Sequence, residues 1–187
     1  MSVADYLKSA SVLFEKTAQS PIAEKIERAI EATVEALRNN HPLLTCGNGG
    51  SAADSMHIAG ELVGRFMKER KAYKCISLSS DPIILSAIGN DYSFEKIFSR
   101  QVEAHGEKGG VLIGLSTSGN SKNVIEAMKK AKELGMTTIG FTGEGGGAMA
   151  SASDILLDVP SKVTPEIQEV HVALYHYFCA EVEKRLS

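Results

Sequence analysis

Apolar residues recur along the chain in two patterns, a helical spacing in longer segments and short continuous runs between them. The helical spacing predicts two leading helices, over residues 3–18 and from residue 21 to about residue 39. The short runs predict strands over residues 42–46, 73–78, 111–115, 137–141 and 155–159. Further helices are predicted between and after them, over residues 52–65, 83–87, 94–104, 122–134 and 165–186.

Strands that alternate with helices are typical of a doubly wound parallel sheet. We therefore expect a three-layer α/β/α protein whose five-stranded sheet has the order 2-1-3-4-5. In that order the first and third strands are neighbours, and the polar turns that follow them, residues 47–51 and 116–121, face one crevice. The whole chain is expected to be one domain: residues 1–40 form helices for oligomerisation, and residues 41–187 form the α/β core and last helix.

The composition of the chain argues against several classes of function. The chain of 187 residues is 43% hydrophobic and 23% charged with a net charge of −3, so nucleic acid is not an expected partner. No apolar run approaches the roughly 20 residues of a membrane span, and the N-terminal residues do not have the pattern of a signal peptide. Three cysteines without metal-motif spacing suit packed, reduced thiols. We expect a cytoplasmic protein without a membrane partner.

The glycine-rich turn at residues 47–51 leads from the first strand into a helix. Glycines let backbone N–H groups approach a ligand, and the helix start favours polar or anionic ligands. On the predicted helix His57, Glu61 and Arg65 recur every four residues and so share one face. The plainer interpretation of this row is an exposed ion pair between Glu61 and Arg65.

The turn at residues 116–121 concentrates hydroxyl groups at the start of a helix. Such a turn can hold a phosphate through hydroxyls and backbone N–H groups, although clusters of this kind also form simple capped loops. Neither a Walker motif nor a dinucleotide fingerprint is present, so a nucleotide cofactor is not expected.

The last predicted helix carries Gln168 and His176 on one face, two turns apart, and His171 off that face. Taken singly, each is more readily explained as a packed or exposed helix residue. They become candidate site residues because the chain also contains two turns that can bind a ligand.

Four stretches together carry a family resemblance: CGNGGSAADSMHIAGELVGRF, IGNDYSFEKIFSRQVEA, LSTSGNSKNVIEAM and EIQEVHVALYH. They resemble the sugar isomerase (SIS) family of phosphosugar-binding domains, and within it the bacterial isomerases that act on sedoheptulose 7-phosphate. The similarity covers essentially the whole chain. One departure is Glu166, where relatives often have an arginine.

The resemblance implies an aldose-ketose isomerase that interconverts sedoheptulose 7-phosphate and D-glycero-D-manno-heptose 7-phosphate through an enediolate, for lipopolysaccharide or capsule synthesis. It implies Glu61 as the base and His176 as the partner acid/base. The residues implied to hold the phosphate are Ser116, Thr117, Ser118 and Ser121. Those implied to contact the sugar are Asn48, Gly49, Gly50, Ser51, Glu61, Asn90, Asp91 and Gln168.

The resemblance also implies a zinc site, because some members of the family bind zinc at the positions of His57, Glu61, Gln168 and His176. It implies a homotetramer with active sites between subunits. Two alternatives stay open at this point: a non-catalytic relative that associates with the replication initiator, and an isomerase for another phosphosugar. Relatives of the first kind lack the glutamate and the histidine that stand here as Glu61 and His176.

Overall fold

The computed structural model of the chain describes residues 2–187. Its strands, in chain order, are β1 Leu43–Gly47, β2 Cys75–Ser77, β3 Val111–Ser116, β4 Thr137–Thr142 and β5 Ile155–Asp158. Its α-helices are α1 Val3–Ala18, α2 Ile22–Arg38, α3 Gly50–Val63, α4 Pro82–Asp91, α5 Ser99–His105, α6 Lys122–Glu133 and α7 Thr164–Leu186. Two 3₁₀ turns are η1 Phe94–Lys96 and η2 Gly147–Ala152. In residues 2–187 we find no helix with the length and apolar character of a membrane span.

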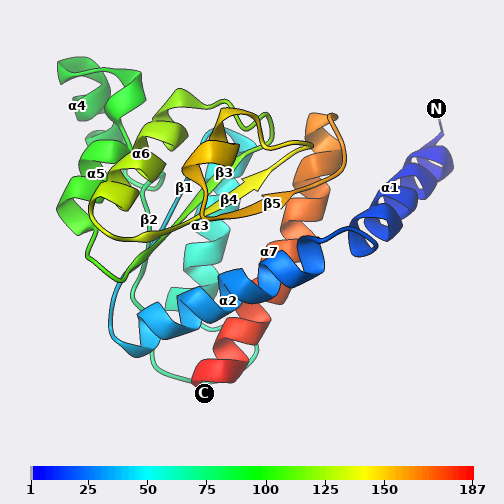
Figure 1. Cartoon of the computed structure of the whole chain (residues 1–187), viewed down its shortest axis with the longest axis horizontal. Helices are drawn as coiled ribbons and strands as arrows, with labels where there is room; N and C mark the ends of the chain where they lie inside the picture. The colour runs from blue at the N-terminus through cyan, green and yellow to red at the C-terminus, as the bar shows by residue number, and fades with distance from the viewer. Residues whose placement is uncertain (1) are drawn as a thin grey trace.

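All the strand pairs in the described sheet are parallel, and the order is β2-β1-β3-β4-β5, as predicted. Helices cover both faces: α2, α3 and α7 pack on one, and α6 with α5 beside it on the other (Figure 1). Successive residues of a strand point to opposite faces. Leu43 accordingly joins the core under α2, α3 and α7, and Leu44 joins the core under α5 and α6.

The helix α1 extends away from this body (Figure 1). It is tied to the rest of the chain by hydrogen bonds from Tyr6 Oη to Glu169 Oε1 at 2.5 Å and from Lys16 Nζ to the carbonyl of Pro160 at 3.0 Å. Large apolar side chains on it remain exposed, among them Val3 at 75% and Leu7 at 62%. The helix therefore presents apolar surface that residues 2–187 do not cover.

The prediction of one helix over residues 94–104 is wrong. The segment forms the 3₁₀ turn η1 and then the separate helix α5. Two adjacent residues between them, Ile97 and Phe98, are both buried, and Gln101 bonds back to the carbonyls of Leu78 and Ile97. Both apolar side chains enter the core at this break, and the two hydrogen bonds of Gln101 fix the start of α5 beside them.

The predicted boundaries of the helix over residues 52–65 are also wrong. The helix α3 begins two residues earlier, at Gly50, and its N-cap Gly49 has φ +55°, a conformation that suits glycine. Gly50 lies so close to Gln168 that an added Cβ would come 2.4 Å from Nε2 of that residue. At the other end the helix stops at Val63, so Arg65 lies outside the row of His57 and Glu61.

The remaining boundaries differ from the predictions by small shifts. The first helical residues of α2 and α7 are Ile22 and Thr164, each one residue from the predicted start. The strand β2 is shorter than the predicted run over residues 73–78. The predicted stop at Gly135 is confirmed by its φ of +77° directly after α6. Element ends commonly shift in this way because caps and fraying set them.

Candidate active site

The two polar turns lie side by side at the carboxyl ends of β1 and β3, as the strand order requires. Two hydrogen bonds join them: Asn48 Nδ2 donates to Asn123 Oδ1 at 2.9 Å, and Asn123 Nδ2 donates to Asn48 Oδ1 at 2.8 Å. A cavity of about 450 Å³ opens here, lined by both asparagines, Ser121 and the start of α6. The prediction that both turns face one crevice is confirmed.

The serine-rich turn is folded around its own hydroxyls. Ser116 Oγ lies 2.9 Å from Ser121 Oγ and 3.4 Å from Ser118 Oγ. Gly119 has φ +64°, and a Cβ there would come 2.1 Å from the carbonyl oxygen of Gly146, so a glycine is required at this position. Ser121 is the N-cap of α6, but its side chain makes no capping hydrogen bond. The hydroxyls thus gather beside the positive end of a 12-residue helix.

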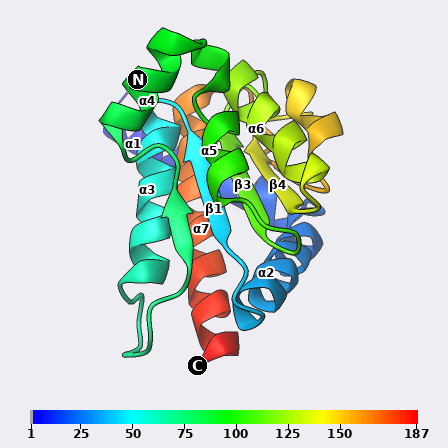
Figure 2. The same ribbon diagram turned by 90° about the vertical axis from the view of Figure 1, so that its left-hand side faces the viewer.

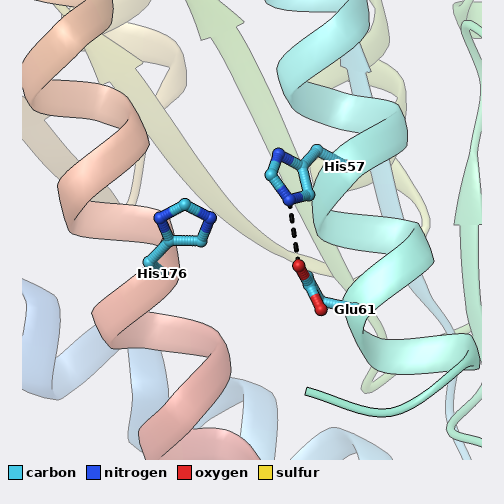
Figure 3. Close-up of side chains that lie close together, drawn as sticks. All are labelled: His57, Glu61 and His176. Carbon is cyan, nitrogen blue, oxygen red and sulfur yellow. Dashed lines mark hydrogen bonds and ion pairs between the residues drawn. The ribbon is translucent and has the colours of Figure 1, made fainter. Parts of the chain in front are cut away.

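The helices α3 and α7 run side by side and bring three predicted residues together (Figures 1 and 2). Nitrogen and oxygen atoms of His57, Glu61 and His176 that can ligate a metal all lie within 4.8 Å of one another. His57 Nε2 is 2.9 Å from Glu61 Oε1, and the rings of His57 and His176 meet edge to face with centroids 5.0 Å apart (Figure 3). Residues far apart in sequence therefore form one cluster.

Gln168 occupies a different position from these three residues. Its Nε2 donates to Asp54 Oδ2 at 2.8 Å, one turn of α3 before His57. His176 lies two turns further along α7, about 12 Å along the helix axis. Within this chain Gln168 therefore lies against the start of α3, beside Gly50, and engages Asp54.

Asn90 and Asp91 are the last two residues of α4, a helix that lies beyond the carboxyl ends of β1 and β2 (Figure 2). Both side chains are exposed, and Asn90 Nδ2 donates to Asp91 Oδ1 at 2.9 Å. They stand outside the cluster of His57, Glu61 and His176. Within the described residues, the predicted site is thus divided into the cluster between α3 and α7, the two polar turns and the end of α4.

Two residues of the site were not among the predicted ones. The Tyr175 hydroxyl lies 3.0 Å from His57 Nδ1, and burial together with the charge of Asp54 raises the pKa of Tyr175 to about 12. Asp54 is itself buried, which raises the pKa of its carboxyl above the usual value. The position of Asp54, three residues before His57 on the same helix face, was a usable signal; Tyr175 had the pattern of a core residue.

A buried ion pair beyond Glu61 was also missed. Arg70 Nε donates to Glu183 Oε1 at 3.1 Å, and the two side chains are 5% and 2% exposed. Glu183 further accepts backbone N–H bonds from Phe66, Met67 and Lys68. Burial acts to raise the pKa of Glu183, but these bonds outweigh it and hold the pKa below its usual value. The pair fixes the end of α3 against α7.

Three kinds of comparison place the chain among known proteins. The SIS domain family matches residues 5–143. A phosphoheptose isomerase of Helicobacter pylori is 48% identical over 172 residues, which cover 92% of this chain and 90% of that protein. One from Clostridium acetobutylicum is 52% identical over 163 residues, 87% of this chain and 83% of that protein.

Solved structures agree with the sequence comparisons. A phosphoheptose isomerase from Neisseria gonorrhoeae superposes with a TM-score of 0.91 at 41% identity, covering 97% of both chains. One from Francisella tularensis has a TM-score of 0.93 at 34% identity, covering 97% of this chain and 96% of the other. The likeness extends through both leading helices and the last helix.

Proposed function

The chain belongs to the phosphoheptose isomerases of the SIS domain family, and we propose that it interconverts sedoheptulose 7-phosphate and D-glycero-D-manno-heptose 7-phosphate. It is a phosphosugar isomerase, and its substrate class is a small heptose phosphate. The observation that carries the proposed reaction is the meeting of Glu61 and His176, a carboxylate and an imidazole from two helices, in one cluster.

The proposed reaction moves one proton between neighbouring carbons. Glu61 takes the proton from C2 of the aldose, the electron pair of the broken C–H bond forms the carbon–carbon double bond, and the π pair of the C1 carbonyl moves to its oxygen, which gives an enediolate. His176 moves a proton between the two neighbouring oxygens. Glu61 then returns its proton to C1, which gives the ketose. In the reverse direction Glu61 takes a proton from C1 and returns it to C2, so the reaction needs no oxidant and no second substrate.

The phosphate is proposed to bind in the serine-rich turn, away from the reacting carbons. The residues proposed to hold it are Ser116, Thr117, Ser118 and Ser121. Two of these hydroxyls, on Ser116 and Ser121, lie 2.9 Å apart at the start of α6. Hydroxyls and the helix dipole both favour an anion there.

The sugar chain is proposed to lie between this turn and α3. The residues proposed to contact it are Asn48, Gly49, Gly50, Ser51, Glu61, Asn90, Asp91 and Gln168. The close approach of Gly50 to Gln168 supports a shared surface for the first part of α3 and the start of α7.

We also propose a zinc site at His57, Glu61 and His176, with Gln168 as a further ligand. Two imidazole nitrogens and a carboxylate oxygen form a known catalytic zinc set that leaves a position for substrate. When bound, zinc polarises substrate oxygens and lowers the cost of negative charge on them. A carboxylate shared with zinc is a weaker base, so the metal and base roles of Glu61 compete. Gln168 would act as a ligand through its amide oxygen, because its Nε2 donates to Asp54 Oδ2.

The proposed assembly is a cytoplasmic homotetramer with sites between subunits, formed from a single domain over residues 1–187 whose first 40 residues serve oligomerisation. The exposed apolar residues of α1 support this, as does an apolar cavity of about 410 Å³ between α1, α2 and α7. The aldose product is proposed to enter lipopolysaccharide or capsule synthesis.

A panel of phosphosugars tests the proposal. Purified chain is incubated with sedoheptulose 7-phosphate, arabinose 5-phosphate and a hexulose 6-phosphate, and the aldose and ketose forms are separated and quantified. We expect turnover of the heptose to exceed that of the others. A preference for a shorter sugar would replace the proposed substrate, and inactivity towards every sugar would contradict the reaction. Metal analysis of untagged protein, with His57→Ala as the control, tests zinc.

A further inference from the structure

Tyr175 lies beside both histidines of the cluster, but none of the roles proposed above is assigned to it. It is 2% exposed, and its hydroxyl is 3.0 Å from His57 Nδ1. Its ring meets His57 and His176 edge to face, with centroids 5.2 Å and 5.0 Å away. Packing therefore holds the phenol ring, and the hydroxyl is directed at one nitrogen of one imidazole.

The two hydrogen bonds of His57 determine how its ring is oriented. Glu61 as a carboxylate only accepts hydrogen bonds, so the proton between it and His57 Nε2 at 2.9 Å belongs to the imidazole. In a neutral ring Nδ1 is then an acceptor, and Tyr175 donates to it. Turning the ring over would exchange nitrogen and carbon positions and break both bonds. As long as Glu61 accepts from Nε2, the two bonds together favour one ring orientation and the tautomer protonated at Nε2.

A hydroxyl also suits the other tautomer of His57. When Nε2 gives up its proton, Nδ1 carries one and donates it to the oxygen of Tyr175, because a hydroxyl can accept as well as donate. The hydroxyl hydrogen then turns to Asp54, whose carboxylate interacts with Tyr175. A hydrogen-bond partner on one ring nitrogen of a histidine commonly orients the ring so that the other nitrogen can bind a metal.

We propose that Tyr175 is a positioning residue of this isomerase, whose hydroxyl keeps Nε2 of His57 directed at Glu61 and His176. This inference rests on the proposed function, because it assigns Tyr175 to the cluster that holds the proposed base and zinc ligands. Phenylalanine at this position would keep the ring packing and remove the hydrogen bond alone.

The test compares Tyr175→Phe with Tyr177→Phe. Tyr177 is the matched control, because it lies two residues along the same helix, is 47% exposed and bonds to Glu27 instead. Zn²⁺ affinity is measured by competition with a chromophoric chelator. The ring nitrogens of His57 are followed by NMR of ¹⁵N-histidine-labelled protein, with His57→Ala to assign the signals.

Tyr175→Phe is expected to weaken Zn²⁺ binding by about 10- to 100-fold, the usual effect of losing such a partner. It is also expected to shift the His57 nitrogen signals towards a mixture of tautomers, while Tyr177→Phe matches the wild type in both. Wild-type Zn²⁺ affinity in Tyr175→Phe, or unchanged His57 signals, would overturn the inference. If the wild type neither isomerises the heptose nor binds Zn²⁺, the proposed function fails, and the nitrogen signals alone decide the positioning role.

Discussion

Glu61 is the side chain that the proposed chemistry uses as its base. It is partly exposed, at 22% of its side chain, and reaches the cluster from the last turn of α3. Glu61→Gln keeps the size and removes the group that takes a proton. We expect kcat to fall by about 10²- to 10⁴-fold, the usual range for an acid/base residue. Steady-state assays with sedoheptulose 7-phosphate measure this.

Glu69→Gln is the matched control for that substitution. Glu69 lies in the loop after α3, and its side chain is 89% exposed with Arg65 as its ion-pair partner at 3.9 Å. We expect it to retain wild-type kcat. Equal activity of the two variants would remove Glu61 from the role of base.

The burial of His171 predicts that the free energy of unfolding depends on pH. It is fully buried, and burial lowers its pKa to about 4 although its bond to the carbonyl of Thr142 acts in the opposite direction. The unfolded chain binds this proton near pH 6.5, and the folded chain does so only near pH 4. The stability that neutral His171 contributes is therefore complete above pH 6.5 and is lost as the pH falls towards 4.

The measurement is the free energy of unfolding by denaturant at pH 7 and at pH 5. Over this interval the wild type is expected to lose about 2 kcal/mol more than His171→Gln, whose amide can still donate to Thr142. The wild type and the variant share all other histidines, so the contributions of those histidines to the pH dependence cancel when the two proteins are compared. Parallel pH profiles would show that His171 takes up its proton equally in the folded and unfolded chains.

At the residue scale, the sequence predicted site residues where side chains suited to acid/base or metal chemistry recur at helical spacing. His57, Glu61 and His176 were predicted as one site from helical spacing and family resemblance, and the structure brings them within 4.8 Å. Tyr175 was not predicted, because a tyrosine at a core position of a helix has the same pattern whether or not its hydroxyl reaches a histidine. Only the packing of α3 against α7 distinguishes the two cases.

At the scale of elements, the end of α3 depends on the side chain of Arg70. Its guanidinium donates to the carbonyls of Glu61, Leu62 and Gly64, which the helix leaves without partners, and to Glu183 on α7. Arg70→Met should destabilise the fold by roughly 3–5 kcal/mol, because it leaves the buried Glu183 carboxylate without its counter-charge. Chemical denaturation measures the loss.

Arg65→Met provides the comparison for an arginine in the same loop. Its pairing with Glu69 is exposed, at 64% and 89% of the two side chains, so its loss should cost less than about 1 kcal/mol. A similar small cost for Arg70→Met would mean that water or another side chain replaces the guanidinium at the end of the helix.

The same contacts explain why element ends were harder to predict than elements. The row that included Arg65 assumed that α3 continues, whereas Gly64 and Arg70 end it, and Arg70 is fixed by Glu183 from 113 residues further along the chain. The break before α5 likewise depends on Gln101 reaching the carbonyl of Leu78. Local patterns predicted the strands, and the expected doubly wound fold predicted their order, but such distant contacts leave no local pattern.

At the scale of the whole molecule, α1 carries large apolar side chains that remain exposed. Val3 and Leu7 are one helical turn apart, and both are largely exposed in the single chain. Exposed apolar side chains that form a stripe on a helix favour association, since burial of each contributes about 1–2 kcal/mol. The proposed tetramer would cover this stripe.

The double substitution Val3→Asp/Leu7→Asp is therefore expected to dissociate the assembly, because two carboxylates would have to be buried without partners. Light scattering after size exclusion should show four chains of 20.0 kDa for the wild type and smaller species for the variant. Ala4→Asp/Lys8→Asp is the matched control, since it introduces the same two carboxylates one residue along, at exposed positions. If the active sites lie between subunits, activity falls together with the tetramer fraction on dilution of the variant. A monomeric wild type would contradict the assembly, and full activity in a dissociated variant would contradict sites shared between subunits.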